Sequence, residues 1–308
     1  MSDVAILGIF VADLAFEAPR LPNMGETLLG QGFRMGPGGK GSNQAVAAAN
    51  SGAHTAFLTR LGQDDFAQIA LNTWGAAGID TSAVIRDPNR PTGAAFIFIS
   101  TQTRNNAIIV ESGAAGAISV ADVEAMADTI TGAKVFVTQL EQPIEAAHHA
   151  LRLARQSGVT TVFNPAPAAD LSDDFLALCD YATPNESEAA AITGQSVETV
   201  EEARAAADIL LARGVKTAVL TLGEKGALYH DGTTSKLVPA YPVGEVRDTT
   251  GAGDAFNGGF ATALSEGRSP LDAVRFACAT ASLSVTRLGT APAMPMREEI
   301  ELLMTEGV

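Results

Sequence analysis

The chain has 308 residues, of which 46% are hydrophobic and 18% charged, a composition that suits a buried globular core and excludes a disordered chain. Its formal net charge of −15 at pH 7 would repel a phosphate backbone, so a nucleic-acid partner is not expected. The same field opposes any anionic ligand, so a nucleotide site here needs local help from helix N-termini, basic side chains or a metal ion.

The chain contains two cysteines, Cys179 and Cys278, which are too few for a disulfide framework or a cysteine-rich zinc site. No apolar run approaches the ~20 residues that a membrane helix needs. The N-terminus carries no basic segment, and Asp13 interrupts its apolar run, so a signal peptide is not expected. We expect a soluble cytoplasmic protein whose thiols are reduced.

The first apolar run extends from Val4 to Leu7 and ends at Gly8. Similar short runs, each expected to be a strand, follow at Thr55–Thr59, Lys134–Thr138, Thr160–Phe163 and Thr217–Thr221. Alanine-rich stretches with helical spacing lie between them, at Asn43–Asn50, Ile144–Gln156 and Val200–Ala212. Strands that are apolar on both faces and alternate with helices are typical of a parallel sheet with helices on each side. The pattern therefore predicts the α/β class.

Two segments, Thr27–Met35 and Ala94–Val110, contain β-forming residues with Gly and Asn turns and no helix between them. In the second segment, Ala94–Ser100 and Asn106–Val110 predict a hairpin closed by Thr101–Asn105. We expect a small β element that is added to the main sheet as a lid over a site. The last third of the chain predicts three helices, at Asp254–Glu266, Leu271–Thr286 and Arg297–Met304.

The segment from Gly36 to Gly41 (GPGGKG) matches the GxGxxG fingerprint of dinucleotide-binding proteins, and two acidic residues follow at Asp64 and Asp65. That fingerprint belongs to the first strand–helix turn, whereas the first strand of this chain ends near Gly8. The context therefore disfavours an NAD-dependent oxidoreductase. A Walker A motif is also excluded, because Gly41 stands where the motif requires Ser or Thr.

Two interpretations of this first glycine segment remain open. It is either a tight turn that begins the helix Ser42–Asn50, or a turn whose N–H groups, together with Lys40 and Asn43, contact a small polar ligand.

A second glycine segment, Asp248–Gly253, leads directly into Asp254 and a predicted helix. Small residues before a helix let the backbone approach an anion, and the free N–H groups of the first turn point at it. The Asp254 carboxylate either only stabilises the helix through its interaction with the helix dipole, or acts as a base beside an anion hole. Phosphoryl transfer to an alcohol requires the second arrangement, since the base accepts the hydroxyl proton while N–H groups stabilise the phosphoryl oxygens.

With these motifs, the chain resembles the ribokinase-like (PfkB-type) sugar kinases along nearly its whole length. GGKGSNQAVAAA at Gly38–Ala49 is similar to the N-terminal signature of the family, and DTTGAGDAFNGGF at Asp248–Phe260 to the C-terminal one. NPAPA at Asn164–Ala168 and TPNESEA at Thr183–Ala189 resemble internal segments of the ribokinases in this family. VTRLGT at Val285–Thr290 follows at the usual spacing.

The resemblance implies one α/β domain over residues 1–308, with a β-stranded lid of about residues 14–36 and 92–112 that often also forms a homodimer. It implies that Asp254 is the general base and that Gly251, Ala252 and Gly253 form the anion hole. It also implies sugar contacts from Asp13, Gly39, Lys40, Asn43, Glu141 and Asp254.

The same resemblance implies ATP and Mg²⁺ as cofactors. Asn185 and Glu188, which match an Asn-x-x-Glu motif, would help to hold Mg²⁺ and the phosphates, through water. The remaining nucleotide contacts implied are Thr221, Gly223, Gly226, Gly253 and Cys278, the last at a position near adenine where ribokinases often have His.

Similar enzymes are often activated by a monovalent cation such as K⁺ beside the anion hole. The matching positions are Asp248, Thr250, Ser284, Arg287, Gly289 and Ala293. Ala293 departs from the usual pattern, because ribokinases commonly offer a hydroxyl there.

A second departure concerns the sugar. Ribokinases typically have Asn-Ala-Asp near the end of the first strand, and this chain has Val11-Ala12-Asp13. Val11 can neither donate nor accept a hydrogen bond, so a ribose hydroxyl would lack a partner there, at a cost of roughly 1–3 kcal/mol.

The sequence therefore predicts an ATP-dependent sugar kinase that acts on a primary hydroxyl, with the 5-hydroxyl of ribose as the expected acceptor. Other sugars, sugar phosphates and nucleosides remain alternatives. A sugar phosphate would need a cation such as Arg34 or Arg104, and a nucleoside would need an apolar wall, for which the candidates are Phe10, Phe16, Phe33, Phe96 and Phe98. A catalytically silent sugar or nucleotide sensor is the alternative outside the enzymes.

Overall fold

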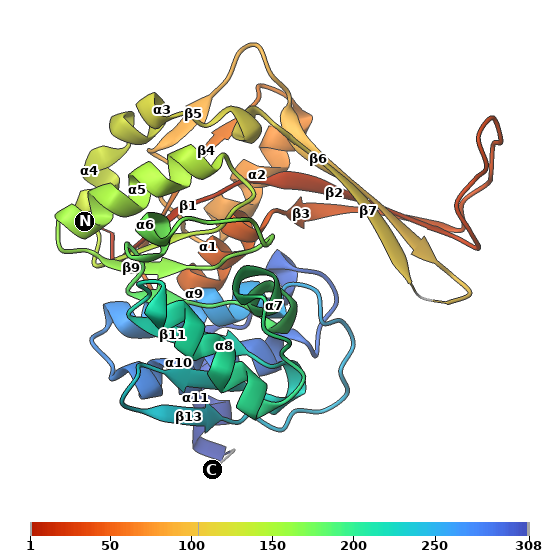
Figure 1. Ribbon diagram of the computed structural model, residues 1–308. Coiled ribbons are helices and arrows are strands. Elements are labelled where there is room, and N and C mark those ends of the chain that lie inside the picture. Colours follow the sequence, from red (N-terminus) through yellow and green to blue (C-terminus); the bar gives the residue numbers. More distant parts are fainter. Residues whose placement is uncertain (1, 104, 307–308) are drawn as a thin grey trace.

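The computed structural model describes residues 2–103 and 105–306 and shows a layered main body from which a second sheet projects (Figure 1). Within these residues, the main sheet has nine strands, which are in spatial order β13 (Ser235–Val238), β12 (Ala227–His230), β11 (Thr217–Thr221), β10 (Tyr181–Ala182), β9 (Thr160–Phe163), β8 (Val135–Thr138), β1 (Val4–Leu7), β4 (Thr55–Leu61) and β5 (Val84–Arg86). The strands from β11 to β5 run parallel, and β12 and β13 add an antiparallel edge.

Helices cover both faces of this sheet. One layer contains α1 (Lys40–Asn50), α2 (Asp65–Ala76), α9 (Ala252–Ser265), α10 (Pro270–Ser284) and α11 (Arg297–Glu306). The other layer contains α3 (Val120–Ala125), α4 (Ala127–Thr131), α5 (Ile144–Gln156), α6 (Asp173–Leu176), α7 (Glu186–Thr193) and α8 (Val200–Ala212). Alternate residues of a strand face opposite sides, so Val4 and Ile6 pack under the first layer while Ala5 and Leu7 pack under the second. The expected α/β class is confirmed.

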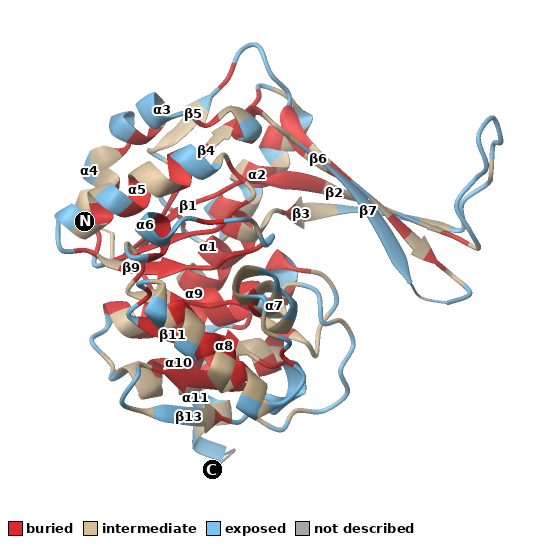
Figure 2. Cartoon of the chain, in the orientation of Figure 1, coloured by how far each residue is buried: buried red, intermediate tan, exposed pale blue. Residues whose placement is uncertain are grey.

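The second sheet has the order β3 (Gly32–Gly38), β2 (Val11–Ala18), β6 (Thr92–Ser100) and β7 (Asn106–Gly113). The predicted hairpin is confirmed, because β6 and β7 pair antiparallel. The β segment predicted over Thr27–Met35 is partly wrong, because β3 begins only at Gly32 and residues 27–31 form no strand. Figure 2 shows that exposed residues predominate on β7 and in the loop after β2, whereas β2 and β6 contain mostly buried and intermediate residues.

Val11 and Asp13 belong to β2 of the second sheet rather than to the end of the first strand, β1. The first strand ends before Gly8, as expected, but the sequence did not reveal that the chain then leaves the main sheet and begins a strand of the second sheet at Val11. The helix after the GPGGKG segment likewise follows β3, not β1. The structural context of a dinucleotide-binding fingerprint is therefore absent, as the sequence indicated.

Helices α1 and α9 lie close together because glycine and alanine line their contact. A Cβ atom on Gly258 of α9 would collide with the Cβ of Ala47 and lie 2.7 Å from the Ala48 nitrogen on α1. The predicted C-terminal helices are confirmed with small shifts of their ends, so that α9 begins at Ala252 and α10 at Pro270. In the part of the chain that the structure describes, no helix combines the length and the apolar character that crossing a bilayer requires.

Candidate active site

The N-termini of α1 and α9 meet beside the carboxyl ends of β1 and β8, where ligands of parallel sheets usually bind. The contact depends on two glycines. A Cβ on Gly8, after β1, would lie 2.7 Å from the Gly41 Cα atom, and a Cβ on Gly41 would lie 2.6 Å from the Gly8 Cα atom. No other residue fits at either position without a shift of the backbone.

Asp254 lies in the first turn of α9 and is only 7% exposed. Its Oδ2 atom accepts a hydrogen bond from Asn43 Nδ2 at 3.0 Å, and its Oδ1 atom accepts one from Gln44 Nε2 at 3.1 Å. Burial raises the pKa of Asp254 above its ordinary value, while the Lys40 ammonium and the two amide donors act in the opposite direction. The carboxylate is thus a buried acceptor that three groups of α1 surround.

The turn before α9 presents N–H groups beside this carboxylate. Gly251, the N-cap residue, has a φ of 80°, which favours glycine. The Ala252 N–H donates to Thr249 O at 3.2 Å, so it is already engaged within the turn. The N–H groups of Gly251 and Gly253 have no hydrogen-bond partner among residues 2–103 and 105–306. These two N–H groups of the expected anion hole are therefore available to donate hydrogen bonds to an anion.

The expected sugar-binding residues lie on the side of Asp254 that is opposite the Gly251–Gly253 turn. Asp13 lies on β2 opposite β3, and a Cβ on Gly38 would collide with its carboxylate. Glu141 follows β8 and accepts the Lys40 N–H through Oε2 at 2.7 Å. Gly39 has a φ of 88°, and a Cβ there would lie 2.5 Å from the Ile9 oxygen. Asn43 Oδ1 is buried and has no partner among the described residues, so it can accept a hydrogen bond from a ligand hydroxyl.

Acidic groups outnumber basic ones in this cluster. Burial, followed by the nearby Asp254 charge, raises the pKa of Asp13 to about 6. Burial also raises the pKa of Glu141 to about 7, although Lys40 counteracts it. Burial acts to lower the pKa of Lys40, but Asp254, Glu141 and Glu188 outweigh it and raise the value. One ammonium therefore offsets several carboxylates whose pKa values are raised by burial.

Asn185 and Glu188 form a capping box at the start of α7. Asn185 Oδ1 accepts the Glu188 N–H at 2.8 Å, and Glu188 Oε2 accepts the Asn185 N–H at 2.9 Å. The motif thus has a local structural role that the sequence interpretation overlooked. Thr221 lies next to Asn185, because its N–H donates to Pro184 O at the end of β11. Burial raises the pKa of Glu188, against the effects of the Asn185 N–H and Lys40.

The other expected nucleotide residues lie around the turn between β11 and β12. Gly223 begins a short 3₁₀ helix (Gly223–Lys225), and Gly226 follows it with a φ of 98°. Cys278 is 3% exposed on α10, and its sulfur lies 3.9 Å from Val238 O, an atom that a Cβ on Gly226 would also meet. Burial raises the pKa of the Cys278 thiol to about 12, so it is not a nucleophile.

The expected monovalent-cation residues lie in the turn before α9 and in the segment from Ser284, at the end of α10, to Ala293, and Asp248 joins the two. Its Oδ1 atom accepts the Thr250 N–H at 2.9 Å, and its Oδ2 atom accepts the Gly289 N–H at 3.0 Å. Burial acts to raise the pKa of Asp248, but these hydrogen bonds outweigh it and lower the value. Ser284 and Ala293 are buried, and the Arg287 guanidinium pairs with Glu299. The described residues contain no cluster of three or more His, Cys, Asp or Glu side chains suited to a metal ion.

The candidates for recognising larger acceptors have separate environments. Phe10 is fully buried and packs edge-on against Trp74, with 5.7 Å between ring centroids. Phe16 contacts Phe33 and Phe96 on the exposed part of the second sheet, and Phe98 is buried. The Nη2 atom of Arg34 lies 3.5 Å from the Oε1 atom of Glu17. Arg104 lies outside the described residues.

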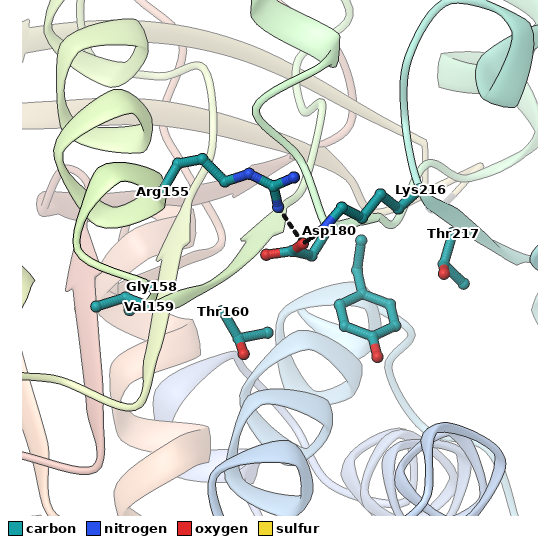
Figure 3. A pocket seen from close by; sticks show the side chains of 8 residues that line it. Arg155, Gly158, Val159, Thr160, Asp180, Lys216 and Thr217 are labelled. Atoms are coloured by element: carbon teal, nitrogen blue, oxygen red, sulfur yellow. Dashed lines mark hydrogen bonds and ion pairs between the residues drawn. The ribbon is translucent and has the colours of Figure 1, made fainter.

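A cavity of about 470 Å³ opens at the opposite, amino-terminal edge of the main sheet, between β9, β10 and β11 (Figure 3). Asp180 in its wall pairs with Arg155 and with Lys216, whose Nζ lies 2.7 Å from Oδ1. Asp180 also accepts the Thr161 N–H at 2.9 Å. These contacts satisfy the carboxylate and join neighbouring strand ends, so the cavity is not part of the cluster around Asp254.

The sequence interpretation missed the residues that hold Asp254 from behind. Gln44 is fully buried and connects Asp254 to Asn164, while Thr183 connects to Asn257 on α9. Gln44, Asn164, Thr183 and Asn257 all lie inside the motifs on which the family resemblance rests. The signal that could have identified them is a polar residue in an otherwise apolar or small-residue segment.

Comparison with known proteins identifies relatives along nearly the whole chain. A family model described as pfkB family carbohydrate kinase matches residues 1–297. The ribokinase of Haemophilus influenzae is 39% identical over 296 residues, which cover 96% of each chain. The deoxyribokinase of Salmonella typhi is 36% identical over 298 residues, or 96% of this chain and 97% of the relative. The structure of Arabidopsis thaliana ribokinase complexed with ribose and ATP has a TM-score of 0.92 at 30% identity and 98% coverage of both chains.

The raised pKa of Glu141 predicts a pH-dependent gain in stability for Glu141→Gln. The pKa rises from 4.5 to about 7 on folding, so the unfolded chain releases its proton first and the free energy of unfolding falls as pH rises through this interval. Gln keeps an acceptor for the Lys40 N–H and removes the charge. We expect a gain of roughly 1–2 kcal/mol at pH 8 and little at pH 4.5 in urea unfolding, less than the full shift because Lys40 loses a partner.

The control for this experiment is Glu245→Gln, which changes an exposed loop carboxylate. It should alter the free energy of unfolding little at either pH. A Glu141→Gln variant that is less stable than the wild type at pH 8 would show that the Lys40 contact outweighs the desolvation of the carboxylate.

Proposed function

This chain belongs to the pfkB family of carbohydrate kinases, and we propose that it transfers the γ-phosphoryl group of ATP to the primary hydroxyl of a small sugar, with the 5-hydroxyl of ribose as the first candidate. The observation that carries the proposal is the buried Asp254 carboxylate, which lies in the first helical turn after the unpaired N–H groups of Gly251 and Gly253. A base beside an anion hole is the arrangement that phosphoryl transfer to an alcohol needs.

In this proposal, Asp254 accepts the proton of the sugar hydroxyl as that oxygen attacks the phosphorus atom. The bond between the γ-phosphorus and its bridging oxygen breaks, and ADP leaves. The N–H groups of Gly251 and Gly253 stabilise charge on the phosphoryl oxygens, with Ala252 as the residue between them. Because the donors belong to a fixed helical turn, they need little reorganisation during the reaction.

The sugar would bind between β2 and the N-terminus of α1. Asp13 and Glu141 offer acceptors for sugar hydroxyls, and the unpaired Asn43 Oδ1 offers a third. Lys40 and Gly39 would complete the contacts from the turn before α1. Holding the sugar in line with the phosphorus supplies the positioning on which phosphoryl transfer depends.

ATP would extend from the anion hole along Asn185, Thr221, Gly223, Gly226 and Cys278. Asn185 and Glu188 fit a Mg²⁺ ion held through water, because both supply oxygen atoms and only one Glu188 oxygen is engaged in the capping box. Bound Mg²⁺ would neutralise phosphate charge, which the acidic surface of this chain otherwise opposes.

A monovalent cation such as K⁺ would bind among Asp248, Thr250, Ser284, Arg287, Gly289 and Ala293. The chemistry of the donors fits, since one carboxylate and a set of backbone carbonyls suit a singly charged ion. Ala293 can contribute only its carbonyl oxygen. Activity assays in K⁺ and in K⁺-free buffer test this site, and equal rates would contradict it.

We propose the second sheet, with about residues 14–36 and 92–112, as a lid that closes over the sugar and excludes water. Its outer strand is apolar on an exposed surface: Ile108, Ile109 and Val110 are 53%, 70% and 50% exposed. Apolar exposure of this extent on a projecting sheet favours a homodimer through the lid.

A second candidate acceptor is 2-deoxyribose. Val11 is 4% exposed, and it lies on the same side of β2 as Asp13, two residues away. An apolar side chain there suits a sugar that lacks one hydroxyl group, and one relative carries the name deoxyribokinase.

Asp254→Asn tests the base. The variant keeps the size and one acceptor of the side chain but cannot take the proton, so we expect kcat to fall about 100-fold or more while the Kd for ATP stays within about twofold. ADP release and calorimetric ATP titration measure the two effects. Asp170→Asn, an exposed carboxylate, is the control and should keep full activity. Turnover retained in Asp254→Asn would remove Asp254 as the base, and a wild type that turns over no acceptor would favour a sensor.

Val11→Asn tests the acceptor. An amide at this position would pair a hydroxyl that Val11 leaves without a partner, so kcat/KM for ribose relative to 2-deoxyribose should rise about tenfold. Val11→Ile adds no polar group and should leave the ratio near the wild-type value. An unchanged ratio in Val11→Asn would place the discrimination elsewhere, and preference for a nucleoside or sugar phosphate in the same panel would replace both pentoses.

Ile109→Lys tests the dimer. A charge in the centre of the apolar strand should convert the wild-type dimer into a monomer in sedimentation equilibrium. Leu302→Lys, which replaces an apolar residue that is 57% exposed on α11, should leave the dimer intact. A monomeric wild type would contradict the proposed association.

A further inference from the structure

A continuous line of buried polar side chains runs behind Asp254, on the side away from the sugar. Gln44 is fully buried at its centre. Its Nε2 atom donates to Asp254 Oδ1 and to Asn164 Oδ1, each at 3.1 Å, and its Oε1 atom accepts a hydrogen bond from Gln139 Nε2 at 2.5 Å. Every polar atom of the Gln44 side chain is therefore engaged.

The direction of these hydrogen bonds follows from the carboxylate. An ionised Asp254 can only accept, so Asn43 and Gln44 must turn their NH₂ groups towards it. Gln44 then presents its oxygen to Gln139, which must donate. As a result, Gln139 Oε1 is buried and has no partner in the part of the chain that the structure describes. Burial of an unpaired acceptor is unfavourable, so the donor orientation towards Asp254 persists against a local cost.

The second branch leads back to the anion hole. Asn164 Nδ2 donates to Thr183 O at 3.0 Å, and Thr183 Oγ1 donates to Asn257 Oδ1 at 2.6 Å. Asn257 Nδ2 then donates to Gly253 O at 2.8 Å. The line thus begins at the carboxylate of Asp254 and ends on the carbonyl of the residue before it. It ties the carboxylate and the turn of α9 to the same buried amides.

We propose that Gln44 is a positioning residue for the phosphoryl transfer, which keeps the Asp254 carboxylate ionised, oriented towards the sugar and in register with the Gly253 turn. This inference rests on the proposed role of Asp254 as base. Gln44 itself contacts neither sugar nor nucleotide in the proposal, since Asp254 and Asn43 stand between it and the sugar side.

Other charged groups also face Asp254, and Gln44 differs from each of them. Lys40 on α1 favours the ionised form, whereas Asp13, Glu141 and Glu188 oppose it with like charge. These groups lie on the open side, where a bound ligand would screen or engage them. Gln44 is a neutral donor in the closed interior, so its effect on Asp254 is independent of the ligand.

Gln44→Met tests the inference, because Met has a similar volume and no N–H group. We expect the pKa of Asp254 to rise by about one unit or more, since the carboxylate loses one of two amide donors in a buried setting. Carboxyl ¹³C shifts of aspartate-labelled protein, assigned by comparison with Asp254→Asn, measure this value. The acid side of the kcat profile should move to higher pH by the same amount, with the Kd for ATP within about twofold.

Gln142→Met is the matched control. Gln142 is also a buried amide, 3% exposed, but its Nε2 donates to Thr138 Oγ1 at 2.8 Å and Gln139 O at 2.6 Å and not to Asp254. Its loss should lower the melting temperature as Gln44→Met does, and leave the titration of Asp254 unchanged. A purely structural Gln44 would behave in the same way as this control, and that result would overturn the inference.

If Gln44→Met does not fold, the nearly isosteric Gln44→Glu replaces it. That variant puts a carboxyl group where the amide donor stood, and the expected rise in the pKa of Asp254 is larger. The ¹³C titration needs no turnover. A wild type that phosphorylates no sugar would therefore refute the proposed function, whereas an unshifted Asp254 in an active Gln44 variant would refute the role of Gln44 alone.

Discussion

The close approach of α1 and α9 is the constraint on which the rest of the site depends. Gly258 and Ala47 let the two helices touch, and Gly8 and Gly41 let the start of α1 lie against the end of β1. Only at this separation can the amides of α1 reach a carboxylate on α9. The proposed sugar site, the proposed anion hole and the buried amides behind them therefore depend on four small residues at helix and strand contacts.

The site is built from groups that destabilise one another. Several carboxyl groups share one ammonium, and burial makes each of them harder to ionise. Such clusters are usual where a protein prepares acceptors for a ligand, because the ligand's hydroxyl groups supply the donors that the free protein lacks. The unpaired Asn43 oxygen fits the same account. Local instability in the free protein thus becomes affinity for a ligand rich in hydroxyl groups.

The main sheet was readable from the sequence because each central strand is a short apolar run between helices. The two residues of β10 are too few to form a pattern, and the apolar residues after Gly8 do not show that β2 belongs to another sheet than β1. Asp254 and Asn43 were expected as site residues from motifs, and Glu141 from the family resemblance alone. The contacts of Gln44 were not expected, because they join residues 95 to 210 positions apart, and only packing decides which buried amides meet.

Asp13 lies three residues into β2, at the root of a sheet that otherwise extends into solvent. A strand fixed at one end behaves as a cantilever, whose displacement grows with distance from the support. At about 3.3 Å per residue, the far end of β2 stands well over 10 Å beyond Asp13, so a rotation that moves the tip by several ångströms shifts this carboxylate only slightly. If the second sheet closes as the proposed lid, its tip would move far more than the Asp13 carboxylate at its root.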